Sequence, residues 1–153
     1  MGLHYEDLEV GSSIKSPGRT ITESDIVAFA GLTGDYNPLH MDETWVRQNT
    51  PFKGRIAHGL LGLAYSVGLG SRTGAMDGTI IAFLGLEWKF IAPIYPGDTI
   101  HQVSTVIEKR TTSKPGRGIV GFEIKVFNQD GAVVQEGKRT LMVKMKNHGN
   151  AGA

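Results

Sequence analysis

The first half of the chain carries hydrophobic residues at helical spacing. Thr22 followed by Asp25 resembles a capping box, and the apolar residues after it predict a helix that ends near Gly34. The last predicted helix, over residues 58–72, is apolar on all sides, which is typical of a buried helix. A short strand is predicted within residues 11–22, and the predicted helices cover about residues 23–32, 43–48 and 58–72.

The second half of the chain has the pattern of strands. Phe122, Ile124 and Val126 alternate with Glu123 and Lys125, as expected of an antiparallel sheet with one face in water. Turn signals separate these runs, and the predicted strands cover residues 79–90, 99–109, 118–128 and 133–144. Helices followed by strands predict an α+β domain.

Glycine is the one residue type that departs from average usage. The chain has 21 glycines in 153 residues, about twice the usual share. Four of them lie in the predicted buried helix: Gly59, Gly62, Gly68 and Gly70. Each costs the helix up to about 1 kcal/mol relative to alanine, and close packing against a sheet would offset that cost. Long antiparallel strands around one glycine-rich buried helix describe a single hot-dog domain, which we expect over residues 1–146, with a flexible tail over 147–153.

Charge and composition exclude several classes of protein. The formal net charge is +1, so no overall field attracts nucleic acid or a membrane surface. The absence of cysteine excludes disulfide scaffolds, thiolate nucleophiles and cysteine-based metal sites. The longest apolar run, between Arg55 and Arg72, is too short to span a bilayer, and the N-terminus lacks the apolar segment of a secretory signal. We therefore expect a cytoplasmic protein with no nucleic-acid or membrane partner.

Candidate chemistry lies in the hexapeptide Asp35-Tyr36-Asn37-Pro38-Leu39-His40. A turn fixed by proline can bring a carboxylate and an imidazole together with little entropy left to lose. Such a pair suits proton transfer, since histidine titrates near neutrality. The spacing alone is also compatible with Asp35 as a turn cap and His40 as a structural histidine.

The segment around this hexapeptide resembles a known family signature. Residues 29–42 read FAGLTGDYNPLHMD, which closely resembles the signature of the MaoC-like dehydratases, the (R)-specific enoyl-CoA hydratases also called hydratase 2. About fifteen residues after His40, the sequence RIAHGLL at residues 55–61 is similar to the family's second landmark, where the central helix begins. The first motif is highly specific because Gly-Asp-x-Asn-Pro-x-His fixes five residue types.

The resemblance implies a hot-dog fold and reversible syn addition of water to a trans-2-enoyl thioester, which gives an (R)-3-hydroxyacyl product. It implies no metal and no cofactor, because coenzyme A is part of the substrate, and it implies a homodimer or higher homo-oligomer. Asp35 and His40 match the family's catalytic pair, with Asp35 taking the proton of water and His40 delivering one to C2. Gly59 matches the position whose N–H binds the enolate oxygen.

Further residues are weaker candidates for the site. Asn37 either braces the loop or acts directly, and His58 either caps or packs the helix start or contacts substrate. Ser66 either presents its hydroxyl to the catalytic histidine or bonds within its own helix. Met76 and the loop over residues 72–78 either line an acyl tunnel or face solvent. Basic residues that could meet the phosphates of coenzyme A, or simply form solvated faces, are Lys89, Lys109, Arg110, Lys114 and Arg117.

Two other functions fit the same fold. A hot-dog thioesterase would share the substrate class but hydrolyse the thioester, and it typically lacks the Asp-x-Asn-Pro-x-His turn. A non-catalytic acyl-CoA-binding subunit would keep the fold without turnover. The presence of both Asp35 and His40 favours the hydratase.

Overall fold

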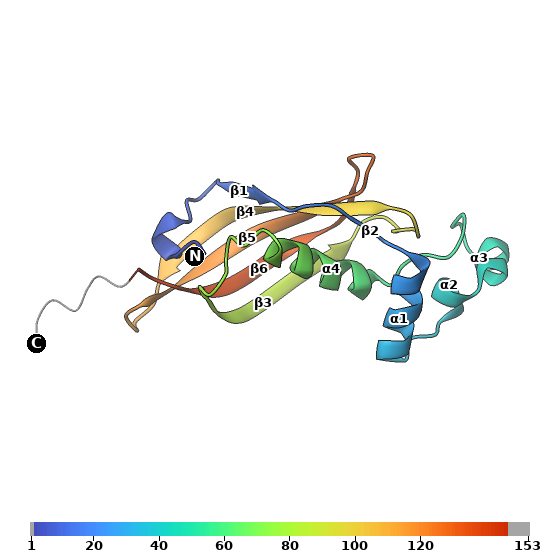
Figure 1. The fold of residues 1–153 in the computed structure, drawn as a ribbon, viewed down its shortest axis with the longest axis horizontal. Coiled ribbons are helices and arrows are strands. Elements are labelled where there is room, and N and C mark those ends of the chain that lie inside the picture. The colour runs from blue at the N-terminus through green and yellow to red at the C-terminus, as the bar shows by residue number, and fades with distance from the viewer. Residues whose placement is uncertain (1, 147–153) are drawn as a thin grey trace, which may run out of the picture.

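One antiparallel sheet curves around a central helix in the computed structural model, which describes residues 2–146 (Figure 1). The predicted tail over residues 147–153 lies outside the described residues. In chain order the elements are η1 (Tyr5–Asp7), β1 (Ser13–Lys15), β2 (Arg19–Thr20), α1 (Glu23–Thr33), α2 (Pro38–Met41), α3 (Glu43–Asn49), α4 (Gly59–Ser71), β3 (Ile80–Phe90), β4 (Thr99–Thr111), β5 (Arg117–Phe127) and β6 (Val133–Lys144). The predicted helices and long strands are confirmed to within one or two residues at most ends, and no described helix is long and apolar enough to cross a membrane.

The sheet has six strands in the order β1-β4-β5-β6-β3, and β2 pairs with β4. All of these pairs are antiparallel. The alternation predicted for β5 is confirmed, because Phe122, Ile124 and Val126 are buried while Glu123 and Lys125 keep part of their surface in water. Strand β3 is at the edge of the sheet and pairs on one side only, with β6.

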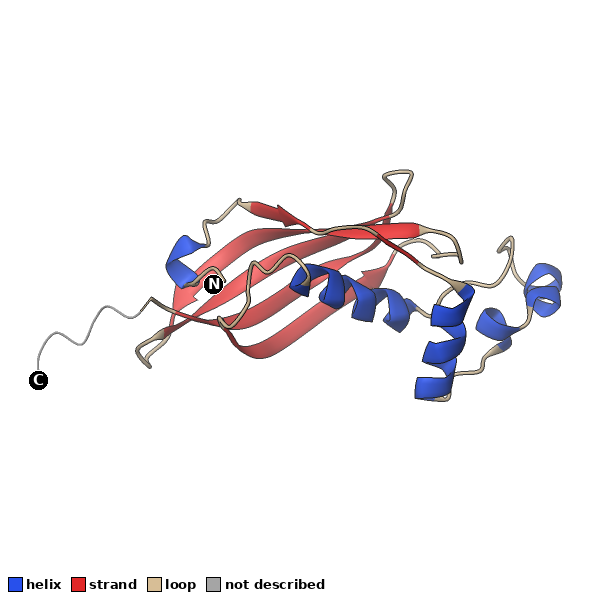
Figure 2. Ribbon diagram, in the orientation of Figure 1, coloured by secondary structure: helices blue, strands red, loops and turns tan. Residues whose placement is uncertain are grey.

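Helix α4 crosses the inner face of the sheet, where it forms the second layer of the fold (Figure 2). Its residues Leu61, Ser66 and Leu69 are buried. Leu60 and Val67 are 60% and 41% exposed, so the expectation of a helix buried on all sides is wrong. The sheet covers only one side of α4. The apolar residues on the other side of the helix, among them Leu60 and Val67, remain exposed.

Two glycines of α4 allow its close approach to the sheet. A Cβ at Gly62 would lie 2.3 Å from Nε2 of Gln135 on β6, and a Cβ at Gly70 would lie 2.3 Å from Nε2 of Gln102 on β4. Apart from its chain neighbours and the backbone of its own helix, no atom of residues 2–146 lies within 4 Å of the corresponding position at Gly68. Close packing is therefore confirmed for Gly62 and Gly70 and is wrong for Gly68, which faces open space.

The short helices α1, α2 and α3 gather beyond the N-terminal end of α4 (Figure 1). The predicted capping box begins α1: the Asp25 N–H donates to Thr22 Oγ1 (3.2 Å), and the Thr22 N–H donates to Asp25 Oδ2 (2.8 Å). Helix α1 ends at Gly34, whose φ of 79° lies in the left-handed region that glycine adopts without strain. This ending turns the chain toward α4 and presents the next residue, Asp35, to the start of that helix.

Candidate active site

The loop between α1 and α2 is held by its own side chains. The Asn37 N–H donates to Oδ1 of Asp35 (3.2 Å), and the Leu39 N–H donates to Oδ1 of Asn37 (3.0 Å). Pro38 follows as the first residue of α2, where its missing N–H is not needed. The Asn-Pro pair thus lies beyond the end of α1 and starts a one-turn helix, which the sequence did not predict. The side chains of Asp35 and Asn37 therefore both stabilise the turn, each by accepting from a backbone N–H two residues further on.

His40 lies in this short helix and is 8% exposed. Its Nδ1 lies 2.8 Å from the carbonyl oxygen of Ile56. A carbonyl can only accept, so Nδ1 carries the proton and the neutral ring leaves Nε2 free as an acceptor. Burial lowers the pKa of His40 below its ordinary value of 6.5, and the neighbouring His58 adds to this, while the Ile56 hydrogen bond and Asp35 oppose it. The resting imidazole is therefore neutral at pH 7, with one nitrogen available to take a proton.

His58 joins the loop between α1 and α2 to the start of α4. Its ring stacks on His40, with 3.8 Å between centroids and 28° between planes, and its Nε2–H donates to the backbone oxygen of Asp35 (2.9 Å). The ring is 3% exposed, and its Nδ1 has no hydrogen-bond partner among residues 2–146. His58 makes no side-chain capping bond to α4. It therefore packs within the cluster and fixes the position of Asp35 rather than capping the helix.

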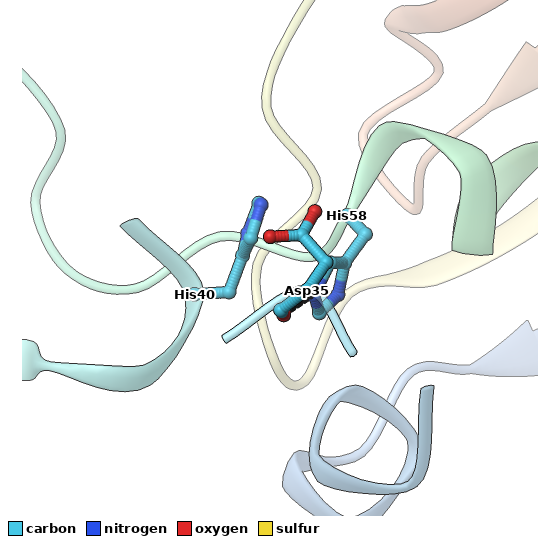
Figure 3. Close-up of side chains that lie close together, drawn as sticks. All are labelled: Asp35, His40 and His58. Carbon is cyan, nitrogen blue, oxygen red and sulfur yellow. Dashed lines mark hydrogen bonds between the residues drawn. The ribbon is translucent and has the colours of Figure 1, made fainter. Parts of the chain in front are cut away.

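Asp35, His40 and His58 come together at the N-terminal end of α4 (Figure 3). One oxygen or ring nitrogen from each residue lies within 4.8 Å of those from the other two. The carboxylate is on an exposed residue, whereas both imidazoles are buried. The folded chain thus brings an ionisable oxygen to a water-accessible position beside a shielded imidazole.

Gly59 follows His58 as the first residue of α4, so its N–H has no acceptor within the helix. Its carbonyl accepts from Nε2 of Gln135 on β6 (3.0 Å), and Oε1 of Gln135 accepts from the indole N–H of Trp88 (3.1 Å). A Cβ at Gly59 would lie 2.7 Å from the ring of Phe90. The start of α4 is therefore anchored to the sheet. Because residue 59 has no side chain, a ligand can approach its backbone directly.

A pocket of about 480 Å³ opens beside these groups. His40, Gly59 and Gln135 lie in its wall, and the rest of the lining is largely apolar, with Phe90 from β3 among the contributors. Its volume is typical of a site for a small organic ligand. An apolar group in the pocket would therefore lie next to an unused backbone N–H and a neutral imidazole.

A family model described as a MaoC like domain matches residues 7–126. The chain belongs to the MaoC-like family. It is 41% identical over 143 residues to the (R)-specific enoyl-CoA hydratase of Rhodospirillum rubrum, covering 92% of each chain, and 38% identical over 117 residues to the 3-hydroxybutyryl-CoA dehydratase of Methylorubrum extorquens, covering 73% of this chain and 71% of that one. The crystal structure of the MaoC-like dehydratase from Rhodospirillum rubrum is similar with a TM-score of 0.81 and 29% identity, covering 95% of this chain and 99% of that one.

These comparisons confirm the hot-dog fold and the family that the sequence resembles. The relatives carry the names of hydratases and dehydratases, which are carbon–oxygen lyases. The expectation of an enzyme of this class is confirmed at that level.

Other predicted residues of the MaoC-like chain lie away from the cluster. Ser66 is two turns further along α4, where its hydroxyl shares a 2.6 Å hydrogen bond with Gln102 of β4. Met76 lines a second cavity, described below, rather than facing solvent. Lys109, Arg110, Lys114 and Arg117 belong to the turn between β4 and β5 and the strands beside it, at the end of the sheet far from α1 and α2 (Figure 1), and Lys89 lies in a groove with other charged side chains of β3, β5 and β6.

Gln135 is a residue of the site that sequence reasoning missed. It shares the inner face of β6 with Leu141 and Val143, because residues an even number of positions apart on a strand point to the same side. A polar side chain at a core position of that alternation was the available signal. The same alternation marks Arg139.

The cluster also offers three atoms of types that bind metals. His40 and His58 are stacked, so the lone pairs of their rings lie in nearly parallel planes and do not converge on one ion at the 2.0–2.1 Å that zinc requires. One nitrogen of each ring is also engaged with a carbonyl. This geometry suits proton transfer better than metal binding, and the absence of a metal remains a prediction.

Proposed function

We propose that this MaoC-like chain catalyses the reversible addition of water to trans-2-enoyl-CoA, giving (R)-3-hydroxyacyl-CoA. The observation that carries the proposal is the placement of His40 and Gly59 in the wall of one apolar pocket, with Asp35 beside His40. Relatives named (R)-specific enoyl-CoA hydratase and 3-hydroxybutyryl-CoA dehydratase support this substrate class. No cofactor is needed, because water and the thioester supply every reacting atom.

Asp35 and neutral His40 can hold one water molecule between them. Both groups are acceptors, so the water donates one hydrogen to each and keeps an oxygen lone pair for attack on C3. As the C3–O bond forms, the proton of water moves to Nε2 of His40 and the electron pair of the double bond moves toward the thioester oxygen. The imidazolium then returns that proton to C2 on the same face, which completes a syn addition and restores neutral His40.

This division of roles differs from the one expected from the sequence, in which Asp35 takes the proton and His40 delivers another. A neutral His40 whose Nδ1–H is bonded to Ile56 holds no proton at Nε2 to deliver. The hydrogen bonds therefore favour His40 as both acceptor and donor. Asp35 orients the water and stabilises the transient imidazolium.

The enolate oxygen needs donors that are already in place. The Gly59 N–H at the start of α4 supplies one, and the positive end of the helix dipole adds to it. Loss of one such donor in other enzymes costs about 2.7–4 kcal/mol of transition-state stabilisation. Gln135, itself held by Trp88, keeps this part of the backbone in position from the side of the sheet.

The decisive assay follows a trans-2-enoyl-CoA, such as crotonyl-CoA, by its ultraviolet absorbance, by free thiol and by chiral analysis of the product. Loss of absorbance without free thiol and with (R) product is expected. Free thiol would indicate a thioesterase, and saturable binding without turnover of any enoyl-CoA would indicate a non-catalytic binding subunit. Either outcome would contradict the proposal.

Variants of the pair test the assigned roles. Asp35→Asn and His40→Gln should each lower kcat by about 10²–10⁴, the usual contribution of one acid–base group. Asp42→Asn is the matched control on the same segment, because Asp42 caps α3 through the Trp45 N–H (2.8 Å) and asparagine caps equally well. A near-normal hydration rate in either the Asp35→Asn or the His40→Gln variant would contradict the mechanism.

We further propose that two copies join along β3. The free edge of this strand is lined by exposed apolar residues: Ile80, Ile81, Phe83, Leu84, Leu86 and Phe90. A long apolar edge strand is a template for pairing with another strand, and a two-fold dimer would satisfy it with the same strand. Sedimentation should show a dimer that Leu86→Lys disrupts and that Val10→Lys, at an exposed apolar residue far from β3, leaves intact. A monomeric parent protein would refute this proposal.

A further inference from the structure

Arg139 is a half-buried cation that the proposed reaction does not use. It lies on the inner face of β6, and its guanidinium makes one long hydrogen bond, to Ser104 Oγ (3.4 Å), and lies 5.3 Å from the ring of Phe122. Its Nε is buried and has no hydrogen-bond partner, and no carboxylate lies within 4.0 Å of the side chain among residues 2–146. Most of the hydrogen-bonding capacity of this guanidinium is therefore unused inside the protein.

A guanidinium that is partly removed from water and has no anion beside it is costly. Burial lowers the pKa of Arg139, but an arginine side chain stays charged in proteins. The carbonyl end of α4 lies nearby and offers partial compensation, since Nη1 is 3.8 Å from the position that a Cβ of Gly70 would occupy. A side chain of this kind is retained at a cost to stability, which is typical of a site that binds a ligand.

A cavity of about 190 Å³ lies against Arg139, at the end of β3 opposite Phe90. Its walls include the apolar side chains of Val67, Met76, Phe83 and Leu141. Asp77 also borders it from an exposed position, without pairing with Arg139. The lining thus combines an apolar passage with a single half-buried cation. That combination fits an apolar chain that ends in an anion.

The proposed dimer gives this cavity a place in the reaction. If two β3 strands pair about a two-fold axis at their middle residue, Gly85, then Ile80 of each copy lies opposite Phe90 of the other. Phe90 lines the candidate active-site pocket, and Ile80 lines the Arg139 cavity. The pairing therefore sets the active-site pocket of each protomer beside the Arg139 cavity of its partner.

We propose that the Arg139 cavity binds a carboxylate at the far end of the acyl chain, so that the enzyme prefers ω-carboxyacyl thioesters, and that each active site uses Arg139 of the partner subunit. This inference rests on the proposed function and the proposed dimer. The planar guanidinium is suited to a carboxylate, which it can hold through two parallel hydrogen bonds. A plain alkyl chain would leave the cation unpaired.

Binding of unreactive analogues tests this independently of catalysis. Calorimetry compares saturated ω-carboxyacyl-CoA with the matching acyl-CoA at six, eight and ten carbons. The intact enzyme should bind one of the carboxylated chains about 10- to 100-fold more tightly than its plain partner, the range expected for hydrogen bonds between charged groups. Arg139→Met should abolish that preference, and Arg139→Lys should retain part of it. Lys138→Met, which removes a cation from the outer face of the same strand, should leave it unchanged.

Several results would overturn the inference. Equal binding of both series at every length would do so, as would a preference that survives Arg139→Met. If Arg139 were a structural residue, Arg139→Met would lower the midpoint of thermal unfolding, whereas a ligand-binding cation predicts an unchanged or higher midpoint in the free enzyme. The enzyme can hydrate enoyl-CoA without preferring carboxylated chains, and it can bind carboxylated chains more tightly without hydrating enoyl-CoA. The proposed function and the carboxylate site are therefore tested separately.

Mixed dimers test the role of the partner subunit. A dimer of one Arg139→Met chain and one His40→Gln chain keeps His40 and Arg139 only on different subunits. Its one competent active site should hydrate ω-carboxyenoyl-CoA in preference to enoyl-CoA, as the parent dimer does. Loss of the preference would show that each chain uses its own Arg139 and would overturn the arrangement across the dimer.

Discussion

Two glycines of the same helix should respond oppositely to alanine. At Gly68 a Cβ meets no atom within 4 Å, so Gly68→Ala removes the helix penalty of glycine and should stabilise the protein by about 0.5–1 kcal/mol. At Gly62 the same methyl group would lie 2.3 Å from Nε2 of Gln135 and 2.9 Å from Cδ1 of Ile94. Gly62→Ala therefore forces a buried side chain to move.

The magnitude at Gly62 follows from what Gln135 holds. Its displacement breaks hydrogen bonds to the Gly59 carbonyl (3.0 Å) and the Trp88 indole (3.1 Å). Each lost bond is worth about 0.5–1.5 kcal/mol, and a buried partner left unpaired costs about 1–3 kcal/mol. Overpacking adds about 1–3 kcal/mol, whereas the helix gain returns at most about 1 kcal/mol. We expect a net destabilisation of about 2 kcal/mol or more.

Urea unfolding of the two variants measures both free energies, and the slopes with urea should match that of the parent protein. Gly62→Ala should also lower kcat, because it releases the start of α4 that presents the Gly59 N–H, whereas Gly68→Ala should not. Equal effects of the two substitutions on stability would refute the argument that contact with the sheet, rather than helix propensity, decides these positions.

The remaining predictions concern pH and the support of the site. The value of kcat/KM should fall as the pH drops through the lowered pKa of His40, below 6.5, because a protonated ring cannot accept the proton of water. Hydration and dehydration should show the same fall at low pH, since the reaction takes up no net proton. A loss of kcat/KM at high pH instead would favour the alternative in which Asp35 takes the proton of water and a protonated His40 delivers another. In histidine NMR titrations, His58→Gln should raise the pKa of His40 and Asp35→Asn should lower it further, because these neighbours act with opposite signs; an unchanged pKa in both would contradict this account. Gln135→Leu should lower kcat with little change in KM, and normal turnover would show that Gly59 needs no such anchor.

The sequence by itself determined the family, most of the order of elements and the segment that carries Asp35 and His40. These features rest on local information: the capping box at Thr22, the left-handed turn at Gly34, the alternation in β5 and the Asp-x-Asn-Pro-x-His motif each act within a few residues. Local hydrogen bonds and side-chain periodicity involve residues close together in the chain, so the sequence is enough to predict such features.

Tertiary structure decided what depends on contacts between distant segments. The stacking of His58 on His40, the anchoring of Gly59 by Gln135 and the place of Arg139 in a cavity wall join residues from separate elements, and no spacing along the chain encodes them. The separation of Ser66 from the site has the same origin, since its nearest polar partner, Gln102, comes from β4. Packing against a curved sheet sets which face of α4 is buried, and with it which polar side chains reach the substrate.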